Sequence, residues 1–528
     1  MKYSVKNPVL RGFHPDPCMI YVDGTYYIAT STFEYYPGVK ISASEDLAHW
    51  RTVSYPLNSL RLLDMRGDLA STGIWAPALS HADGKFWLIF TNQRQWLDGH
   101  LKDTENYLTT CETIDGEWSD PVYLNGSGFD PSLFHDDDGR KYLLNMCWDY
   151  RYDSDDERFS GILLQEYDPV VKKLIGKPAK IFTGTERRIT EGPHMFKKDG
   201  WYYLLTAEGG TGYPHCATLA RSRSVYGPFE LHPDKHIITA WQTDCYLQKA
   251  GHASLCRGRD GEWVLAHLCG RPLPDGRCML GRETAIQNVV WKEDGWPYLA
   301  NGTMNPSDTF EAFAPADPSA VDKTYRFDGG TPDIDFMTLR QPVTREVFDL
   351  DARPDWLRIR GGKSLMALQD QSVLVRRQEA FAFECETMLE FAPENIDEWA
   401  GLLYRYSENN QHYVYVSFDD RTGGRELLKI GYDDSKFRLE RIAALPRDGA
   451  VWIRLCVDHA KGQFCYSTDG KTFERAGDEF DASKLSDEYN RPLSFTGPYV
   501  GMACQDLANA SKTADFAYFR YTEKESRQ

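Results

Sequence analysis

The sequence lacks the marks of a membrane protein or of a disulfide-stabilised one. Its 528 residues contain no stretch close to the roughly 18 consecutive apolar residues that a membrane-spanning helix needs. Residues 1–7 lack the apolar run of a secretory signal, so we expect a cytoplasmic protein. The 12 cysteines include no Cys-x-x-Cys pair, which favours reduced, mostly buried thiols over a disulfide framework or a zinc site.

Positive charge is also scarce. The chain has 60 lysines and arginines against 78 aspartates and glutamates, for a net charge of −18. Such a surface repels nucleic acid and anionic lipid but not a neutral sugar chain. Aromatic residues, by contrast, are abundant, with 30 Tyr, 26 Phe and 14 Trp. Most are expected in a β-sheet core, and a handful could line a cleft, where their faces pack against sugar rings.

Helical periodicity is absent from the first 300 residues, and an internal repeat takes its place. An Asp-Gly pair followed by an aromatic or β-branched strand occurs five times, at spacings of 60, 55, 61 and 61 residues. Asp-Gly is a strong signal for the turn of a β-hairpin. Short strands repeating at this length predict a five-bladed β-propeller. A β-sandwich array with an accidental Asp-Gly pattern is the alternative, and the near-equal spacings argue against it. The pairs begin at Asp23, Asp83, Asp138, Asp199 and Asp260.

One position in each repeat carries a chemically distinctive residue, seven or eight residues before the Asp-Gly pair. Because the first strand of each blade lines the central axis, these side chains should converge there. Three converging carboxylates repel one another and lose solvation, which is typical of a site of chemistry. Strand-end acids on the rim are the structural alternative. The five residues are Asp16, Trp75, Asp130, Glu191 and His252.

Two acids across a cleft suit glycosidic bond cleavage. One must be protonated to donate to the leaving oxygen, and the other must be ionised to attack or to activate water. A third carboxylate can raise the pKa of the acid by like-charge repulsion. The sequence therefore predicts a glycoside hydrolase.

Several motifs resemble those of glycoside hydrolase family 43, in order and in register with the repeat. They are NPVLRGFHPDP at 7–17, GFDPS at 128–132, TEGPH at 190–194, LGRETA at 280–285 and FTGPYVG at 495–501. The chain is most similar to the β-xylosidase branch of long, two-domain enzymes.

This resemblance implies a five-bladed propeller followed by a C-terminal β-sandwich, and a reaction that inverts the anomeric carbon. It implies that Asp16 is the general base, Glu191 the general acid and Asp130 the residue that tunes the acid. It implies no required cofactor and no metal ligands, although a divalent cation such as Ca²⁺ could lie near His252. The implied substrate-binding residues are Phe33, Trp75, Trp148, His252 and Arg282.

Each of these binding residues has a structural alternative. Phe33 and Trp148 follow strand-like runs and could belong to the core. His252 could be a core histidine with its hydrogen bonds satisfied. Arg282 could form a surface ion pair, although a guanidinium is a good donor to sugar hydroxyls.

The repeat stops after about residue 297, and the composition then changes. We predict a catalytic propeller over residues 1–305, a linker rich in Asn, Asp, Pro and Gly over 306–335, and an antiparallel β-sandwich over 336–528. We expect the sandwich to shape the cleft and to hold subunits of a homo-oligomer together, and a lectin-like role is the alternative. Phe495 is the candidate to reach the cleft, with Tyr499 as the alternative.

The expected activity is exo-acting, inverting release of xylose from the non-reducing end of β-1,4-xylooligosaccharides, with α-L-arabinofuranosidase side activity. α-L-Arabinofuranosidase as the main activity is one alternative. A retaining fructan or sucrose hydrolase is another, and it would need its two acids closer together. A non-catalytic sugar-binding protein would not need all three axial acids.

Overall fold

The computed structural model describes residues 1–96, 100–317, 319–490 and 495–524. The chain divides into two compact units. The first consists of Met1–Arg271 with Arg282–Ala316, and the second of Pro272–Gly281 with Asp317–Gln528. No helix in the described residues is long and apolar enough to cross a membrane.

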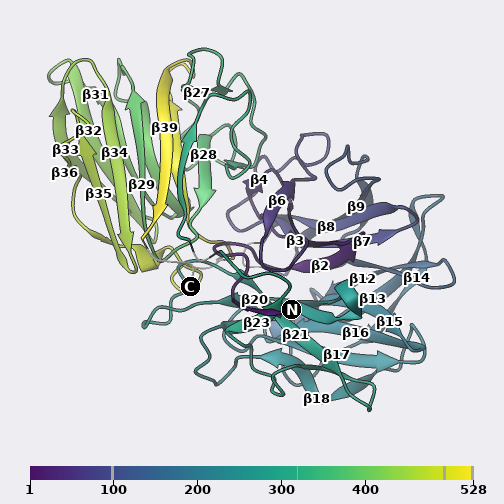
Figure 1. The fold of residues 1–528 in the computed structure, drawn as a ribbon. Helices are drawn as coiled ribbons and strands as arrows, with labels where there is room; N and C mark the ends of the chain where they lie inside the picture. Colours follow the sequence, from purple (N-terminus) through teal and green to yellow (C-terminus); the bar gives the residue numbers. More distant parts are fainter. Residues whose placement is uncertain (97–99, 318, 491–494, 525–528) are drawn as a thin grey trace. The chain divides into compact units, whose positions relative to one another are not determined.

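The first unit contains five four-stranded antiparallel sheets, which are drawn in purple to teal in Figure 1. Each sheet is one blade, so the predicted five-bladed β-propeller is confirmed. Blade 1 consists of β2 (Cys18–Val22), β3 (Thr25–Thr30), β5 (Lys40–Ser44) and β6 (Arg51–Ser54). Blade 2 consists of β7 (Gly73–Ala82), β8 (Lys85–Gln95), β9 (Asp103–Cys111) and β10 (Val122–Asn125). Blade 3 consists of β11 (Ser132–His135), β12 (Lys141–Trp148), β13 (Phe159–Asp168) and β14 (Lys173–Phe182). Blade 4 consists of β15 (Glu191–Lys198), β16 (Trp201–Glu208), β17 (Cys216–Ser222) and β18 (Glu230–Thr239). Blade 5 consists of β19 (Gln248–Arg257), β20 (Trp263–Gly270), β21 (Glu283–Trp291) and β22 (Pro297–Leu299).

The Asp-Gly repeat forms the turn between the first two strands of each blade. In four of the five copies both Asp and Gly have positive φ, as at Asp23 (47°) and Gly24 (87°). A two-residue hairpin turn of type I′ needs this conformation at both positions. Blades 1, 2 and 4 have this two-residue turn, whereas five residues separate the two strands in blades 3 and 5, and in blade 3 only Gly139 of the pair has positive φ. The turn residues thus set where each blade begins.

Apolar side chains pack between neighbouring blades and close the ring. One core cluster joins blade 1 to blade 5 and includes Met19, Ile28 and Ile286. The Ser254 hydroxyl reinforces this junction, accepting from the Met19 N–H at 2.8 Å and donating to the Pro17 carbonyl at 2.9 Å. The first and last blades are therefore joined by side-chain contacts as well as by the chain itself.

The predicted boundary between the domains needs two corrections. Residues 306–335 are not a plain linker, since they contain β23 (Thr309–Ala312) and β24 (Asp322–Arg326). β23 pairs with β1 (Tyr3–Lys6) in the propeller unit, and β24 pairs with a sandwich strand. The segment Pro272–Gly281, placed by the sequence inside the propeller, belongs to the second unit. Short strands among Asn, Asp, Pro and Gly leave a weak pattern, and a ten-residue insertion leaves none.

The second unit is a sandwich of two antiparallel sheets, as predicted. The smaller sheet runs β28 (Ser372–Arg377), β38 (Tyr499–Asp506), β30 (Glu398–Ser407), β31 (Asn410–Asp419), β32 (Gly424–Asp433) and β33 (Lys436–Leu445). The larger runs β26 (Phe348–Asp349), β27 (Leu357–Arg360), β39 (Thr513–Glu523), β29 (Ala382–Glu390), β34 (Val451–Asp458), β35 (Lys461–Ser467) and β36 (Glu474–Arg475), with β24 on β39 and β37 (Phe480–Asp481) on β35. The remaining elements are β4 (Tyr35–Tyr36), β25 (Thr338–Leu339), α1 (Asp155–Arg158) and the 3-10 turns η1 (Arg259–Gly261) and η2 (Ala482–Lys484). Leu273 and Met279 from the inserted segment belong to the sandwich core.

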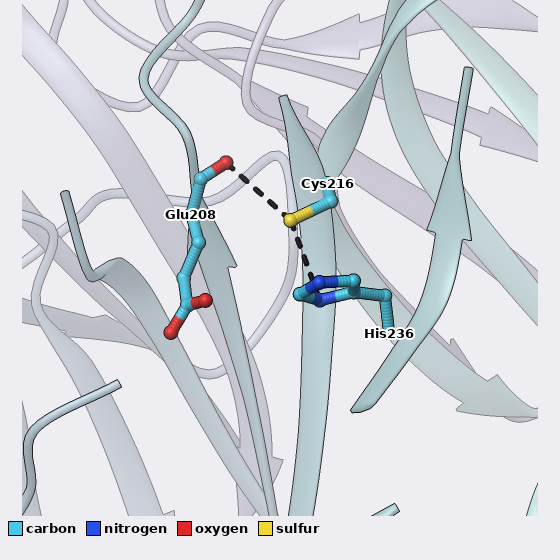
Figure 2. Close-up of side chains that lie close together, drawn as sticks. All are labelled: Glu208, Cys216 and His236. Atoms are coloured by element: carbon cyan, nitrogen blue, oxygen red, sulfur yellow. Dashed lines mark hydrogen bonds between the residues drawn. The ribbon is translucent and has the colours of Figure 1, made fainter. Parts of the chain in front are cut away.

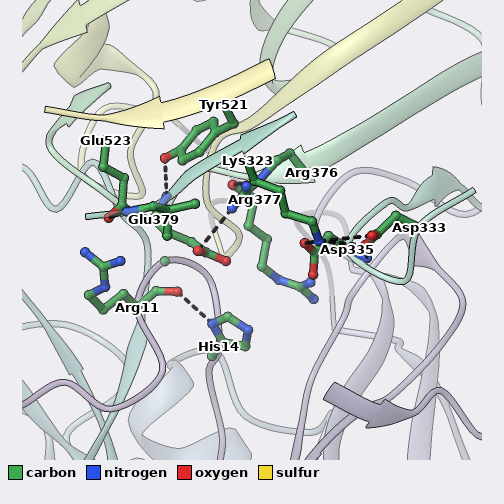
Figure 3. Close-up of polar contacts among 12 residues, drawn as sticks. Arg11, His14, Lys323, Asp333, Asp335, Arg376, Arg377, Glu379, Tyr521 and Glu523 are labelled. Atoms are coloured by element: carbon green, nitrogen blue, oxygen red, sulfur yellow. Dashed lines mark hydrogen bonds and ion pairs between the residues drawn. The ribbon is translucent and has the colours of Figure 1, made fainter. Parts of the chain in front are cut away.

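A buried arginine organises polar contacts within the sandwich (Figure 3). Arg376 donates to the Tyr325 hydroxyl at 2.9 Å, lies 3.0 Å from Glu379 and stacks 3.9 Å from the Tyr521 ring centroid. Burial would raise the pKa of Asp335, but the charge of Arg376 and bonds from Lys323 and Tyr325 lower it to about 2. Because each charge has a partner, the cluster avoids the cost of an unpaired buried ion.

Candidate active site

The five repeat-position residues lie where the first strand of each blade begins. Asp16 and Asp130 come two residues before β2 and β11, Glu191 opens β15, and Trp75 and His252 lie within β7 and β19. All five residues are buried, with only 5–7% of their surface exposed. The blade architecture thus places them in one buried region of the propeller unit.

A left-handed backbone recurs at this point in every blade. In blades 1, 3 and 5 the distinctive residue itself has positive φ, and in blades 2 and 4 the following residue does. The strand ladder also shifts register here in blades 2, 4 and 5. A non-glycine residue in this conformation costs about 1–2 kcal/mol. Because the conformation recurs in all five blades despite this cost, we infer that it sets the direction of the five side chains. The φ values are 56° at Asp16, 36° at Ala76, 55° at Asp130, 56° at Gly192 and 42° at His252.

Asp16 is held in its ionised form. Its Oδ1 accepts from Arg282 Nη1 at 2.9 Å, its Oδ2 accepts from the Ser31 hydroxyl at 2.6 Å, and His252 Nδ1 lies 3.7 Å away. Burial alone would raise the pKa of Asp16, but the charges of Arg282 and His252 and the Ser31 bond outweigh it, so the pKa is lowered. Arg282 is buried and pairs with this acid, so it is not the surface ion-pair residue of the structural alternative.

Asp130 and Glu191 are shifted in the opposite direction. Burial raises the pKa of Asp130 to about 6. The charge of His252 opposes this shift, and the negative charge of Asp16 adds to it. Burial, followed by the charges of Asp130 and Asp16, raises the pKa of Glu191 well above its ordinary value. Asp130 Oδ2 accepts from the N–H of Gly192 at 3.0 Å, which ties the two acids together through the backbone. One site therefore holds a carboxyl group whose pKa is lowered and another whose pKa is raised, the opposite shifts that general base and general acid catalysis need.

His252 lies between the acids, with Nδ1 3.7 Å from Asp16 and 4.0 Å from Asp130. A second histidine in this region, His215, was missed by the sequence analysis. It is fully buried, and a Cβ added to Gly251 would lie 2.2 Å from its ring. Burial, followed by the charges of His252 and Arg282, lowers the pKa of His215 to about 3. His215 precedes β17 outside the repeat position, so no pattern could have marked it.

Two of the predicted binding aromatics form a buried wall. The Phe33 ring centroid lies 5.8 Å from that of Trp75, and the Arg282 guanidinium lies 5.3 Å from the Phe33 ring. Phe33 has φ 53°, a conformation uncommon for an aromatic residue. Phe33 therefore lies beside Arg282, the partner of Asp16, and Trp75 lies beside Phe33. The wall also includes Phe13, whose ring lies 5.4 Å from Phe33 and which sequence reasoning missed.

Trp148 lies in a second aromatic group that continues from Trp75. Trp96 joins the two, with ring centroids 5.0 Å from Trp75 and 5.1 Å from Trp148. Phe129 packs edge-on at 5.3 Å from Trp75, and Lys102 Nζ lies 4.2 Å from the Trp96 ring. Sequence reasoning missed Trp96 and Phe129, although Phe129 stands directly before Asp130 and could have been found from that position.

Phe495 belongs to the second unit, where it is half-buried. Tyr499 opens β38 of the same unit and is fully buried. Whether either residue reaches the cleft stays a prediction.

One group in blade 4 has the composition of a metal site (Figure 2). Ligand atoms of Glu208, Cys216 and His236 lie within 4.8 Å of one another. However, His236 Nδ1 already lies 2.9 Å from the Thr218 hydroxyl, and burial raises the pKa of Cys216 to about 12. Because the thiolate is the form that binds metals, and because the charge of Arg187 acts on both Cys216 and His236, we interpret this group as a hydrogen-bonded cluster.

Comparison with known proteins defines the class. Residues 5–297 match Glycosyl hydrolases family 43, and residues 324–522 match the Beta xylosidase C-terminal Concanavalin A-like domain. The chain belongs to glycoside hydrolase family 43 and is a two-domain enzyme of that family. Enzymes of this family invert the anomeric carbon and need no cofactor for catalysis.

Three similar proteins cover nearly the whole chain. A Bacillus subtilis protein named Beta-xylosidase is 46% identical over 99% of this chain and 100% of its own length. Xylosidase/arabinosidase 43B of Humicola insolens is 45% identical over 98% of this chain and 97% of its own. The crystal structure of xylan beta-1,4-xylosidase from Bacillus halodurans C-125 has a TM-score of 0.95 and 46% identity, covering 98% of this chain and 100% of its own.

Proposed function

We propose that this enzyme is an exo-acting β-xylosidase that releases xylose from the non-reducing end of β-1,4-xylooligosaccharides with inversion. The observation that carries the proposal is the opposite shift of pKa at Asp16 and Glu191 within one buried site. Opposed acids of this kind support hydrolysis of a glycosidic bond. A non-catalytic sugar-binding role leaves them unexplained.

In the proposed reaction Glu191 donates its proton to the leaving glycosidic oxygen while Asp16 takes a proton from a water molecule. That water attacks the anomeric carbon from the face opposite the leaving group, the bond between this carbon and the glycosidic oxygen breaks, and the product has inverted configuration. Asp130 orients Glu191 through its bond with the N–H of Gly192. An inverting enzyme needs its two carboxyl groups roughly 6.5–9.5 Å apart, whereas the retaining fructan or sucrose hydrolase would need them closer.

The sugar preference is supported by the three relatives, two of which are named as xylosidases and one as a xylosidase/arabinosidase. α-L-Arabinofuranosidase activity is therefore the second candidate, as a side activity or as the main one. The two sugars present similar hydroxyls, so one small pocket can admit both.

A Ca²⁺ ion beside His252 receives less support. Carboxylate oxygens of Asp16 and Asp130 lie within 4.0 Å of this histidine, and Ca²⁺ prefers oxygen ligands. Arg282, however, already neutralises Asp16 at 2.9 Å and would repel a cation. We propose that hydrolysis uses the side chains of the enzyme alone, in which case EDTA leaves kcat/KM unchanged.

We further propose that the enzyme works in the cytoplasm on neutral oligosaccharides, as a homo-oligomer. All 12 cysteines lie in the described residues and are free thiols, which favours a reducing compartment. Cell fractionation tests the location, and light scattering after size exclusion tests the oligomeric state.

The test of the proposed function combines two variants with two leaving groups. Asp16→Ala and Glu191→Ala should each lower kcat on xylobiose by about 10²–10⁴-fold, the usual contribution of a positioned acid or base. Glu191→Ala should lose much less activity on an activated nitrophenyl β-xyloside, because a good leaving group needs little protonation. The nitrophenyl α-arabinofuranoside measures the second candidate.

The stereochemical course completes this test. Proton NMR of the earliest product from a β-linked substrate should show α-xylose. β-Xylose as the first product, or near-normal hydrolysis of xylobiose by either variant, would contradict the roles assigned to Asp16 and Glu191.

A further inference from the structure

A buried carboxylate anchors the loop that leads into Glu191. Glu208 is the last residue of β16 and follows Ala207, which pairs with Glu191 across the β15–β16 ladder. Glu208 Oε1 accepts from the Thr185 N–H at 2.8 Å and from the Thr190 hydroxyl at 3.3 Å, and its Oε2 accepts from the Thr185 hydroxyl. One side chain thus fixes both ends of the segment 185–190.

The anchored segment has a strained backbone. Arg188 and Ile189 are consecutive non-glycine residues with φ of 62° and 52°, each at a cost of about 1–2 kcal/mol. The N–H of Gly209, next to Glu208, donates to the Arg188 carbonyl at 2.8 Å. Strained conformations persist only where the surroundings fix them, and they concentrate at functional sites. Here the strained pair ends at Ile189, two residues before Glu191.

The residues around Glu208 are closely packed. A Cβ added to Gly184 would lie 1.9 Å from the Thr190 hydroxyl oxygen and 2.6 Å from Glu208 Oε1. Glu208 itself is fully buried. The loop and its anchor are therefore closely packed against each other.

We propose that Glu208 is a positioning residue for the general acid: it holds the strained segment 185–190 in the geometry that directs the carboxyl group of Glu191 at the glycosidic oxygen. This inference rests on the proposed function of Glu191. Glu208 acts through the loop, and its three bonds to Thr185 and Thr190 account for a buried carboxylate that the proposed chemistry does not use.

Glu208→Gln is the variant that tests this inference. It keeps the volume of the side chain, but its NH₂ group replaces one of the two accepting oxygens, so at least one of the three bonds from Thr185 and Thr190 is lost or reversed and the loop loosens. A displacement of about 1 Å can cost about 10²-fold in rate, so kcat on xylobiose should fall by about 10–100-fold. The rate on an activated aryl xyloside, which needs little proton donation, should fall less than about threefold, with KM little changed.

The pH profile of Glu208→Gln gives a second readout. A displaced Glu191 is less buried and feels Asp130 less, so its raised pKa falls. The basic limb of kcat/KM should therefore move to lower pH. If Glu208→Gln does not fold, Thr190→Val removes one donor with the shape retained and should show a weaker effect of the same kind.

The matched control is Asp136→Asn. Asp136 also has a well-buried carboxylate, bonded to Lys197 and Tyr202 at 2.9 Å each. Lys197 is six residues from Glu191 along β15, roughly 20 Å at the usual rise per residue, so this variant should lower both activities equally or not at all. Equal losses on both substrates in Glu208→Gln, with an unmoved basic limb, would overturn the positioning role. If Glu191→Ala itself showed no dependence on the leaving group, the proposed function would fail instead.

Discussion

Arg282 lies 2.9 Å from Asp16, and its charge is the largest of the contributions that lower the pKa of that carboxyl group. The same charge also acts to lower the pKa values of Asp130 and Glu191. Sequence reasoning expected Arg282 as a donor to sugar hydroxyls. The structure shows in addition that Arg282 is paired with Asp16 and that its charge acts to lower the pKa values of all three acids.

Removing this charge should shift the whole pH–rate profile. In Arg282→Ala, burial acts on Asp16 with less opposition, so its pKa rises and the acidic limb of kcat/KM moves to higher pH. The basic limb moves in the same direction, because Glu191 also loses a nearby positive charge. Each unit of pKa shift corresponds to about a tenfold loss on the acidic side.

A full pH–rate profile of the wild type, Arg282→Ala and Arg282→Lys checks this expectation. The lysine variant keeps the charge and should retain limbs closer to those of the wild type. An acidic limb that stays in place in Arg282→Ala would mean that Arg282 does not control the ionisation of Asp16.

At the scale of strands, the close approach of β19 to His215 gives the second prediction. A Cβ on Gly251 would lie 2.2 Å from the His215 ring, and the next residue is His252. Gly251→Ala should therefore displace either the ring or the strand, at a cost of about 1–3 kcal/mol in unfolding free energy, and should lower kcat/KM as His252 moves.

Gly24→Ala is the control for this variant. Nothing lies within 4 Å of its added Cβ, and its φ of 87° makes the cost purely conformational, on the order of 1 kcal/mol. Urea unfolding and kcat/KM of both variants give the comparison. If Gly251→Ala resembles Gly24→Ala in both measurements, the approach of β19 to His215 is not the constraint described.

The strands also show what a sequence can predict here. The blades were predictable because each Asp-Gly turn fixes a hairpin, and the repeat carries the residues before it to equivalent positions, from Asp16 to His252. β24 was missed because few residues of its short strand are apolar. His215 and Trp96 were missed because they reach the site from loops and strand ends that the repeat does not align. The insertion Pro272–Gly281 was missed because its attachment to the sandwich is a long-range contact without a local pattern.

At the scale of the whole molecule, many buried histidines are kept neutral by the fold. His215 and His267 are fully buried, and burial is the first cause that lowers their pKa values, to about 3 and about 4. The ordinary value is 6.5. The described residues include seven histidines, four buried and three half-buried, with lowered pKa values: His135, His194, His215, His232, His236, His267 and His412.

These shifts predict that the protein becomes less stable in mild acid. Above pH 6.5 these histidines are neutral in both states, and their contribution to stability is fully present. As the pH falls from 6.5 toward 4, the unfolded chain binds protons that the folded protein does not, so each fully buried histidine lowers the unfolding free energy by up to about 1.4 kcal/mol per pH unit. The raised pKa values of Asp130, Glu191 and Glu208 act in the opposite direction, but these acids are fewer.

The Tm measured at constant ionic strength should therefore fall steadily from pH 7 to pH 5, and His267→Gln should make the fall shallower. A Tm that stays level or rises over this range would show that the folded protein takes up these protons, and that burial does not hold the histidines neutral.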